Sequence, residues 1–308
     1  MIEMNVLDNG HLQTPFGILG GVASHSCYES GEIRDVILND KNMILTHVGE
    51  LVPYYTETPR RKHKSSLSFH KNGLVKSVSL ENQQEIVTPI GEFPAELVTF
   101  YETGELHRLF PLDGQISGFW TEKDEGALNI PFSFEFDFGA FSAMLVGICF
   151  YKSGNVKSIT LFPGEAITLD LPWGKTNVKT GFSLFESGRL HTLEPAVPSP
   201  VNTPVGKINA FDAQANGITA DSCSLCLSDE GKVLSLITSS DCIAVQTSDG
   251  KMKLFSPLKK ISPLDDETEI TLGMSVSFDY EKNTVTIAGK DTCTYCISDC
   301  GFNILSKA

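Results

Sequence analysis

The stretch SFHKNGLVKSVSL, residues 68 to 80, reads as two short β-strands joined by a tight turn at Asn72 and Gly73. An Asn-Gly pair between two strand-like segments is a strong hairpin signal, because glycine, and asparagine after it, adopts positive φ angles with little strain. A similar stretch, TFYETGELHRLFPL, returns at residues 99 to 112. The sequence therefore predicts a β-hairpin that occurs more than once in the chain.

Six glycines share one pattern of flanking residues. The positions six and four residues before the glycine are apolar in every copy, except that the first copy has His25. The positions two and five residues after it are apolar in all copies. Where Asn72 stands in the second copy, four others have Ser or Thr, which favours a type I turn that closes on a glycine bulge and leaves the register ambiguous by one residue. The glycines are Gly31, Gly73, Gly104, Gly154, Gly188 and Gly231, with partial copies around Gly250 and Gly301.

A third segment follows several of these hairpins, so we expect a repeat of about three short strands. The phrase Thr-Pro-x-Gly occurs at 14–17, 88–91 and 203–206. We expect it to mark the places where one repeat ends and the next begins. At 132–138, Phe alternates with Ser, Glu and Asp, which predicts a strand whose aromatic face lies in the core.

The chain has 308 residues, of which 41% are hydrophobic, and these values suit a folded protein with a sizeable core. Amphipathic helical periodicity is hard to find, and short strands punctuated by Gly and Pro predict an all-β fold. Hairpins that cannot bury a face alone must stack on their neighbours. We therefore expect repeated antiparallel hairpins stacked into an elongated array, either a single sheet or solenoid-like. The array forms a single domain, 1–308, with 1–13 and 256–308 as candidate capping segments.

The charge balance is acidic, with 24 Lys and Arg against 38 Asp and Glu and a formal net charge of -14. Such a chain repels phosphate backbones and anionic lipids, so we expect neither a nucleic-acid nor a membrane partner. The basic run RRKHK at 60–64 reads as a solvated connector rather than a docking patch. No apolar run is long enough to span a membrane and the start of the sequence lacks a secretory signal, which indicates a cytoplasmic protein.

Residues 100 to 120, FYETGELHRLFPLDGQISGFW, resemble the bacterial variant of the MORN repeat. Repeats of that family have an aromatic pair, a polar residue, Asn-Gly or a similar pair, Leu-Lys, and then Gly-x-x-x-Gly-x-Trp. The residues that fit this pattern are Phe100, Tyr101, Gly104, Leu106, Gly114, Gly118 and Trp120.

The resemblance is partial and covers roughly half of the chain in scattered pieces. The Gly-x-x-x-Gly-x-Trp ending is missing from the other copies, and the repeat spacing is more irregular than in the family. The resemblance implies a β-hairpin array for protein interaction or scaffolding, as in the antitoxin-like members, with no catalytic residues to carry over. The second copy keeps Phe69, Asn72, Gly73, Val75 and Lys76, and the fourth keeps Phe150, Tyr151, Gly154, Val156 and Lys157.

Eight cysteines include two Cys-x-x-Cys pairs, Cys223 with Cys226 and Cys293 with Cys296, which together could supply the four thiolates of a zinc site. The repeat pattern favours another explanation. Cys226 lies in a column of small side chains five residues before the glycine, and so does Cys296 if Gly301 is its anchor. Residues three apart on a strand also point to opposite faces. We therefore expect packing cysteines, no metal and no other cofactor.

The position three residues after the glycine is basic or potentially basic in five of the six copies. A ladder of such groups along one face could form a track for anions or another interaction surface. Lys and Arg also guard exposed strand edges against aggregation, and the sequence favours that structural explanation. The candidate interaction residues are Arg34, Lys76, His107, Lys157 and His191.

Nucleophile elbows, phosphate-binding glycine loops and His-x-x-x-His motifs are absent from the sequence. The sequence therefore favours a non-enzymatic scaffold that presents a surface to a protein partner of unknown identity. The alternative is a carbohydrate-binding or carbohydrate-active β-protein, because distant carboxylate pairs carry no short motif. That alternative needs exposed aromatic side chains in a groove. The aromatic candidates are Trp120, Trp173, Tyr54 and Tyr55.

Overall fold

The computed structural model describes residues 4–7, 10–215, 217–263 and 267–306, and the fold is all-β. The described residues form thirty β-strands, many of them paired as hairpins. They also form one short α-helix, α1 (Glu122–Gly126), and two 3-10 helices, η1 (Pro59–Arg61) and η2 (Ile297–Asp299).

Contacts divide the chain into two compact units. Unit 1 comprises Met1–Pro131 and Met144–Lys157. Unit 2 comprises Phe132–Ala143 and Ser158–Ala308. The single domain of 1–308 that the sequence predicts stays a prediction.

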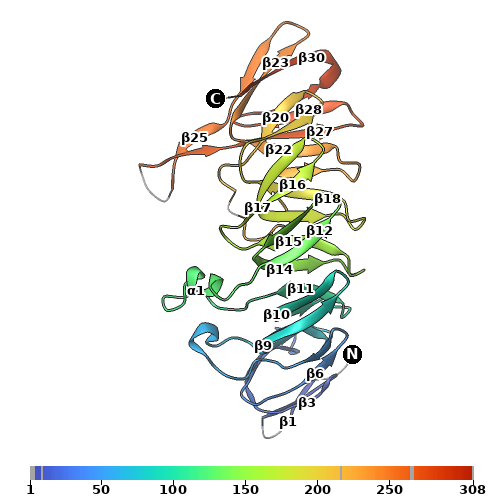
Figure 1. Cartoon of the computed structure of the whole chain (residues 1–308), viewed down its shortest axis with the longest axis vertical. Helices are drawn as coiled ribbons and strands as arrows, with labels where there is room; N and C mark the ends of the chain where they lie inside the picture. The colour runs from blue at the N-terminus through green and yellow to red at the C-terminus, as the bar shows by residue number, and fades with distance from the viewer. Residues whose placement is uncertain (1–3, 8–9, 216, 264–266, 307–308) are drawn as a thin grey trace. The chain divides into compact units, whose positions relative to one another are not determined.

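Sixteen strands form one large antiparallel sheet, in which the strands follow one another in chain order (Figure 1). The sheet begins at β4 and ends at β29, so it does not close into a barrel. Its last three strands come from the segment 256–308. In order, the strands are β4 (Val22–Cys27), β5 (Ile33–Leu38), β8 (Leu67–Phe69), β9 (Val75–Thr88), β10 (Gly91–Phe100), β11 (Leu106–Phe110), β14 (Leu145–Phe150), β15 (Val156–Leu161), β17 (Gly174–Leu184), β18 (Leu190–Pro195), β21 (Leu225–Leu227), β22 (Val233–Thr238), β27 (Met274–Asp279), β28 (Thr284–Ala288) and β29 (Thr292–Cys296), with β16 (Ala166–Leu171) paired to β17.

The remaining strands form small sheets of two or three strands beside the large one. Two of these small sheets have three strands: β1 (Asn5–Leu7), β2 (His11–Thr14) and β3 (Gly17–Leu19), and β24 (Met252–Phe255), β23 (Asp241–Thr247) and β30 (Cys300–Ser306). The others are hairpins: β6 (Ile44–Thr46) with β7 (Gly49–Leu51), β12 (Phe132–Phe136) with β13 (Gly139–Ala143), β19 (Ser199–Thr203) with β20 (Gly206–Ala210), and β25 (Leu258–Ile261) with β26 (Glu269–Leu272).

The hairpins of the large sheet turn at the predicted glycines. In the third copy, the N–H of Tyr101 donates to the carbonyl oxygen of Glu105 at 2.9 Å, and the N–H of Gly104 donates to that of Tyr101 at 2.9 Å. Gly104 has a φ of +102°, which glycine adopts without strain. The other five copies have the same two hydrogen bonds and a positive-φ glycine. The prediction of a type I turn that closes on a glycine bulge is therefore confirmed.

The Thr-Pro-x-Gly phrase forms the turn of a second kind of hairpin. At 88–91 the threonine hydroxyl donates to the glycine carbonyl oxygen at 2.7 Å and accepts the N–H two residues ahead at 3.3 Å. The same bonds close the turns at 14–17 and 203–206. The turn at 88–91 connects β9 to β10 and so joins the second copy to the third. This repeat therefore contains two hairpins, and four strand segments instead of the expected three.

The two partial copies have different outcomes. At Gly250 the predicted turn occurs, but it joins β23 to β24 outside the large sheet. Gly301 lies within β30, opposite Gln246, and is not a turn residue. The prediction of a copy at Gly301 is therefore wrong, and Cys296 does not belong to the column that precedes a turn glycine.

The core of each unit contains the apolar columns that the sequence predicts. In the third copy, Val98, Phe100 and Leu109 are at most 3% exposed. Burying side chains of this size stabilises the fold by about 1.5–3 kcal/mol each. The first copy is the exception, because His25 and Cys27 are exposed on β4, the first strand of the sheet.

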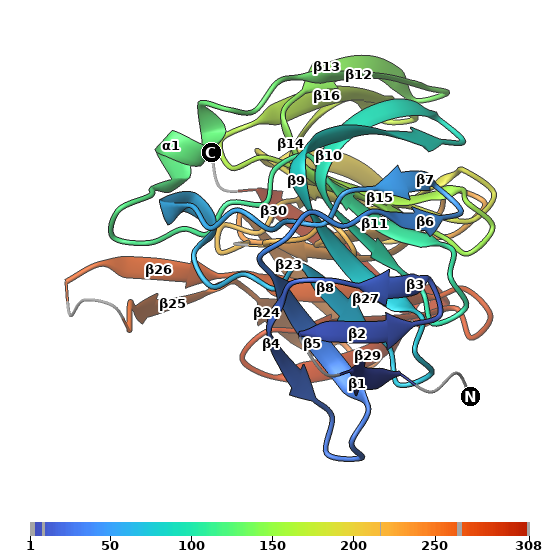
Figure 2. The same cartoon turned by 90° about the horizontal axis from the view of Figure 1, so that it is seen from below.

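The aromatic segment at 132–138 forms β12 and the turn after it, within unit 2. Its first two phenylalanines are buried. The rings of Phe136 and Phe138 stack at 5.1 Å, and both meet the Phe182 ring edge-on, at 5.7 and 5.4 Å. The hairpin lies beside β16 (Figure 2), where the N–H of Asp170 donates to the Phe138 carbonyl at 2.9 Å. The prediction that this aromatic face belongs to the core is confirmed for Phe132 and Phe134, which are buried. Phe136 and Phe138 contact the buried ring of Phe182.

The basic segment 60–64 is folded inward in unit 1, so the expectation of a solvated connector is wrong. Arg60 forms ion pairs with Glu96 at 2.7 Å and with Glu125 at 2.6 Å. Arg61 is 4% exposed and pairs with the same Glu96 at 2.7 Å. The carboxylates come from distant parts of the sequence, which no local pattern reveals.

The remaining residues of this segment divide between the interior and the surface. The ammonium group of Lys64 pairs with Asp113, whose pKa is raised by burial although Lys64 opposes the shift. Lys62 and His63 are exposed. Three of the five basic side chains therefore hold unit 1 together, and two face solvent.

Helix α1 positions Glu125 for this network. The helix starts with a capping box, in which the Thr121 hydroxyl accepts the N–H of Asp124 at 3.2 Å and the Asp124 carboxylate accepts the N–H of Thr121 at 2.9 Å. Glu125 is 6% exposed and also accepts the N–H of Gly114 at 2.7 Å. The short helix therefore presents a buried carboxylate to Arg60.

Candidate functional site

Four of the five basic candidate residues share a structural role, because each is the extra residue of a second β-bulge that follows the hairpin turn. In the third copy the strand pairing shifts between Thr99 and Phe100, so His107 has no residue opposite it on the neighbouring strand. The same shift occurs in the first, second and fifth copies, and Lys157 has the equivalent sequence position in the fourth. Bulges re-aim side chains, which explains why this column departs from the buried pattern. The extra residues in those three copies are Arg34, Lys76 and His191.

Several of these side chains contact an aromatic ring of their own hairpin. The His107 ring lies 4.3 Å from the Tyr101 ring, and Lys157 Nζ lies 5.8 Å from the centre of the Tyr151 ring. Lys152 of the following hairpin lies 5.5 Å from the Tyr101 ring. Contacts of this kind contribute about 0.5–1 kcal/mol at exposed sites. In these hairpins an aromatic ring therefore orients His107 and Lys157.

The first and fifth copies differ in detail. Arg34 pairs with Asp35 at 2.7 Å and is half exposed. In unit 2, the His191 ring lies 4.3 Å from the Phe185 ring, and burial lowers the pKa of His191. His191 therefore favours the neutral imidazole more than a free histidine does.

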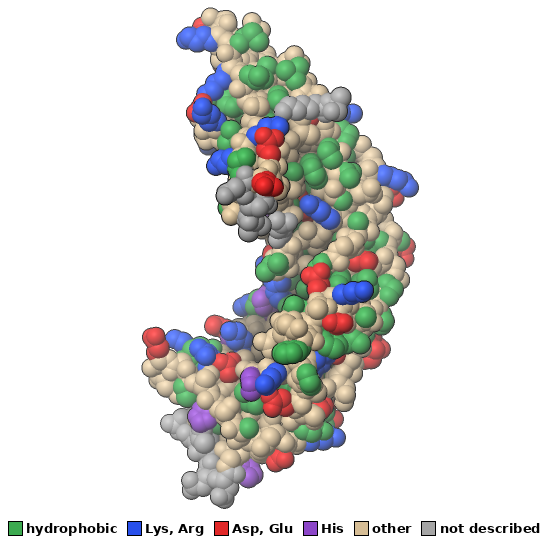
Figure 3. Space-filling view, turned by 90° about the vertical axis from the view of Figure 1, so that its left-hand side faces the viewer, with side chains coloured by type: hydrophobic (Ala, Val, Ile, Leu, Met, Phe, Trp, Pro, Cys, Tyr) green, Lys and Arg blue, Asp and Glu red, His purple; other side chains and the backbone are tan. Residues whose placement is uncertain are grey.

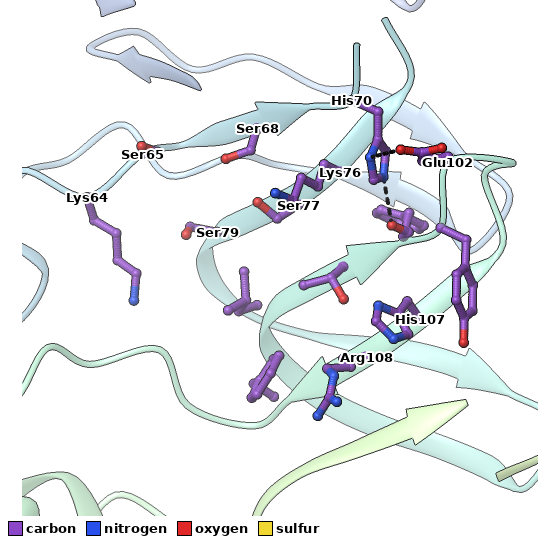
Figure 4. A pocket seen from close by; sticks show the side chains of 15 residues that line it. Lys64, Ser65, Ser68, His70, Lys76, Ser77, Ser79, Glu102, His107 and Arg108 are labelled. Carbon is purple, nitrogen blue, oxygen red and sulfur yellow. Dashed lines mark hydrogen bonds and ion pairs between the residues drawn. The ribbon is translucent and has the colours of Figure 1, made fainter. Parts of the chain in front are cut away.

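One pocket in unit 1 brings together two of the predicted residues, Lys76 and His107, with His70 and Arg108 (Figure 4). Its volume is about 720 Å³, which is within the range of small-molecule sites. Strands β8 to β11 supply most of its lining. His70 is held at its rim by a 3.0 Å hydrogen bond between its Nε2 atom and the Phe100 carbonyl oxygen.

Sequence reasoning missed the hydroxyl groups of this pocket and Arg108. Ser68, Ser77 and Thr99 line the pocket on the same face of the sheet as Arg108. A signal was available, because the residue four positions after each turn glycine is polar in all six copies. Ser77 and Arg108 occupy this position. A second polar column next to the basic one could have indicated a continuous polar face.

No family model, curated protein or solved structure matches this chain. The MORN resemblance therefore stays a prediction, and the arguments about function depend on the residues themselves.

The zinc hypothesis concerns four cysteines of unit 2. Cys223 lies 3.8 Å from the carbonyl oxygen of Gly181, and burial raises the pKa of its thiol to about 12, which disfavours the thiolate that zinc needs. Cys293 Sγ instead lies 3.2 Å from Lys253 Nζ. Within the described part of the chain, no three His, Cys, Asp or Glu side chains are grouped so as to hold a metal ion. The four candidates were Cys223, Cys226, Cys293 and Cys296.

A second pocket, in unit 2, has an aromatic and acidic lining. Trp173 lines it together with Asp137, Asp170 and Asp229, and its volume is about 320 Å³. Trp173 is half-buried, and its indole N–H donates to Thr176 Oγ1 at 3.1 Å. This is the one carbohydrate candidate among the described aromatics that lies in a pocket with several carboxylates.

The other aromatic candidates serve mainly the fold of unit 1. Tyr54 is 5% exposed. The indole N–H of Trp120 donates to Glu125 at 2.6 Å, and Arg60 lies 5.9 Å from the centre of the Trp120 ring. Tyr55 is half-buried and lines a small pocket with Tyr54. These residues do not form the shared groove that carbohydrate binding requires.

The visible charged side chains are of both signs. On the face drawn in Figure 3, Lys, Arg, Asp and Glu side chains are interspersed, so the acidic excess does not gather into one patch there. Among the described helices, none has the length and apolar character needed to cross a bilayer.

Proposed function

We propose that this protein is a non-enzymatic β-repeat scaffold that binds a protein partner along the outer face of its sheet hairpins. The observation that supports it is one recurring arrangement, a histidine at the bulge position against an aromatic ring of the same hairpin. The pairs Tyr101 with His107 and Phe185 with His191 have the same ring separation of 4.3 Å.

The repetition of this arrangement favours a protein partner over a small-molecule ligand. Similar groups on successive hairpins offer several weak contacts that act together, as in other repeat proteins. Aromatic and Arg side chains are enriched where protein interfaces concentrate their binding energy. Rings that are already held in place also lose little conformational entropy on binding. The MORN resemblance implies the same role.

A cytoplasmic location belongs to this proposal. All eight cysteines are free thiols, which suits a reducing compartment. The formal charge of -14 disfavours nucleic acid as the partner.

Affinity capture with the full chain as bait tests the scaffold proposal. Lys76→Glu combined with Lys157→Glu reverses two charges of the bulge column. Lys41→Glu combined with Lys123→Glu makes the same change at exposed lysines elsewhere in unit 1. We expect a protein that the wild-type and control baits capture and the bulge variant loses, with binding reproduced from purified components. Retention by both variants, or no partner at all, would contradict the proposal.

The carbohydrate alternative is favoured by one observation, the pocket in which Trp173 lies beside Asp137, Asp170 and Asp229. A ring next to several carboxylates suits a sugar, which offers apolar ring faces and many hydroxyl donors. Screening the full chain against a glycan array tests it. Binding that Trp173→Ala abolishes and Trp120→Ala preserves would favour this second function over the first.

A further inference from the structure

A row of small hydroxyl side chains crosses one face of the large sheet in unit 1. Ser68 lies opposite Ser77, Ser77 lies opposite Thr99, and Thr99 lies opposite Arg108. Directly opposite residues project to the same face, with Cβ atoms about 4.5–5.5 Å apart. Three hydroxyls and a guanidinium are therefore neighbours, and Figure 4 shows Ser68 and Ser77 on one side of the pocket and Arg108 on the other.

The same row already binds a carboxylate one strand further along. Asp35 lies opposite both Ser26 and Ser68, and its carboxylate accepts their hydroxyls at 2.9 and 2.7 Å. Burial alone would raise the pKa of Asp35, but the hydrogen bonds from Ser68, Arg34 and Ser26 lower it overall. The row therefore stabilises a negative charge placed on it.

Unit 2 shows the same arrangement with a residue from a loop. Ser158 lies opposite Ser183, and Ser183 lies opposite Thr192. Asp221, between β20 and β21, accepts the Ser158 hydroxyl with its carboxylate at 2.7 Å. In each unit, a carboxylate of the chain itself therefore occupies part of the hydroxyl row.

Thr99 is the place where the row is incomplete. Its Oγ1 atom is buried and has no hydrogen-bond partner in the part of the chain that the structure describes. Leaving such a group unpaired costs about 1–3 kcal/mol, so a ligand oxygen in the pocket would be stabilised there.

Basic side chains outnumber acidic ones among the residues that line this pocket. Lys76 and Arg108 line it with one carboxylate, that of Glu102, whereas Lys64, which also lines it, is already paired with Asp113. The chain as a whole has a formal charge of -14, so the lining of this pocket differs from the average of the chain. A concave site with one sign of charge concentrates ions of the opposite sign.

We infer that this pocket binds a small anionic ligand, whose carboxylate or phosphate group accepts hydrogen bonds from Ser77, Thr99 and Arg108. Leu97 and Phe110 line the same pocket and offer apolar surface to the rest of the ligand. A guanidinium has five N–H donors, so Arg108 can donate to either kind of oxyanion in addition to its interaction within the chain. The site goes beyond the scaffold function and does not depend on a protein partner.

Isothermal titration calorimetry of the full chain tests this site, with inorganic phosphate and glutarate as separate probes at constant ionic strength. Arg108→Gln removes the guanidinium and Thr99→Val removes the hydroxyl, whereas Arg189→Gln removes an exposed guanidinium that does not line this pocket. We expect saturable binding, weakened about tenfold or more by Arg108→Gln and about threefold to tenfold by Thr99→Val. Arg189→Gln should leave the affinity unchanged. The tighter probe identifies the class of oxyanion.

Three results would overturn the inference. The first is no saturable binding of either probe, and the second is equal weakening by Arg189→Gln, which would indicate unspecific charge attraction. The third is an acidic peptide that binds at Thr99 where both small probes fail, which would assign the pocket to a protein. Thermal melting without probe checks the fold of each variant, and Thr99→Val decides the test if Arg108→Gln does not fold.

Discussion

The hydroxyl group of Tyr101 donates a 2.8 Å hydrogen bond to the backbone carbonyl oxygen of Phe150, which ties one sheet hairpin to the first strand of the next. Tyr28 makes the same bond to Phe69 at 2.8 Å, and His70 has the corresponding place in the second hairpin. The aromatic column is therefore a set of joints between hairpins. The bond to Phe150 fixes the Tyr101 ring, and His107 and Lys152 lie against that ring.

Replacing Tyr101 by Phe keeps the ring and removes one joint. We expect the free energy of unfolding to fall by about 1 kcal/mol, the usual net contribution of such a bond. Urea denaturation of the full chain measures it. Tyr55→Phe is the control, because the Tyr55 backbone N–H is hydrogen-bonded and its hydroxyl has no partner among the described residues. Equal losses in the two variants would contradict a role as a joint.

Gly104→Ala tests the turn on which the repeat depends. Alanine would have to adopt the φ of +102°, and a Cβ atom there meets open space, so backbone strain accounts for the whole cost. We expect a loss of about 1–2 kcal/mol in thermal or urea melts. Gly118→Ala is matched, since its Cβ also meets open space without a positive φ. A similar loss at both positions would show that the turn geometry is unimportant.

Glu125→Gln tests the buried ion-pair network of unit 1. The change leaves Arg60, whose side chain is 14% exposed, with Glu96 as its remaining carboxylate. We expect a loss of about 3 kcal/mol, because a buried charge that loses a partner is poorly solvated. Glu122→Gln removes an exposed carboxylate from the same helix and should change stability little. A loss below that of the control would mean that the network is not stabilising.

His191 gives the stability of the protein a pH dependence of known sign. Burial lowers its pKa, so the folded chain binds fewer protons than the unfolded chain between that value and the ordinary value of 6.5. The free energy of unfolding therefore falls as the pH drops through this window. His191→Phe keeps the ring against Phe185 and cannot titrate. We expect it to lose less stability than the wild type between about pH 7.5 and about pH 5, measured by urea midpoints. The same loss of stability in His191→Phe and in the wild type would exclude His191 as a source of the pH dependence.

Local features of the fold could be predicted, because each depends on residues close together in the chain. The turn at Gly104 and the buried columns beside it follow from the conformational freedom of glycine and the apolar spacing. The basic column was found by the same alignment, and its cause, a bulge, was consistent with the ambiguous register. The second hairpin was missed because the Thr88 phrase was interpreted as a boundary between repeats, whereas it is itself a turn.

The tertiary structure alone decided which of these residues meet. Arg60 reaches Glu96 and Glu125 across 36 and 65 residues of sequence, so its burial depends on long-range contacts. Ser77 and Thr99 share a pocket because two hairpins pair in one register, and a shift of one residue would turn either strand's side chains to the other face. The sequence by itself determined the repeated hairpin through local turn and strand preferences. Only the pairing of distant strands decided the pocket and the ion-pair core, since that pairing is set by the packing of the whole sheet.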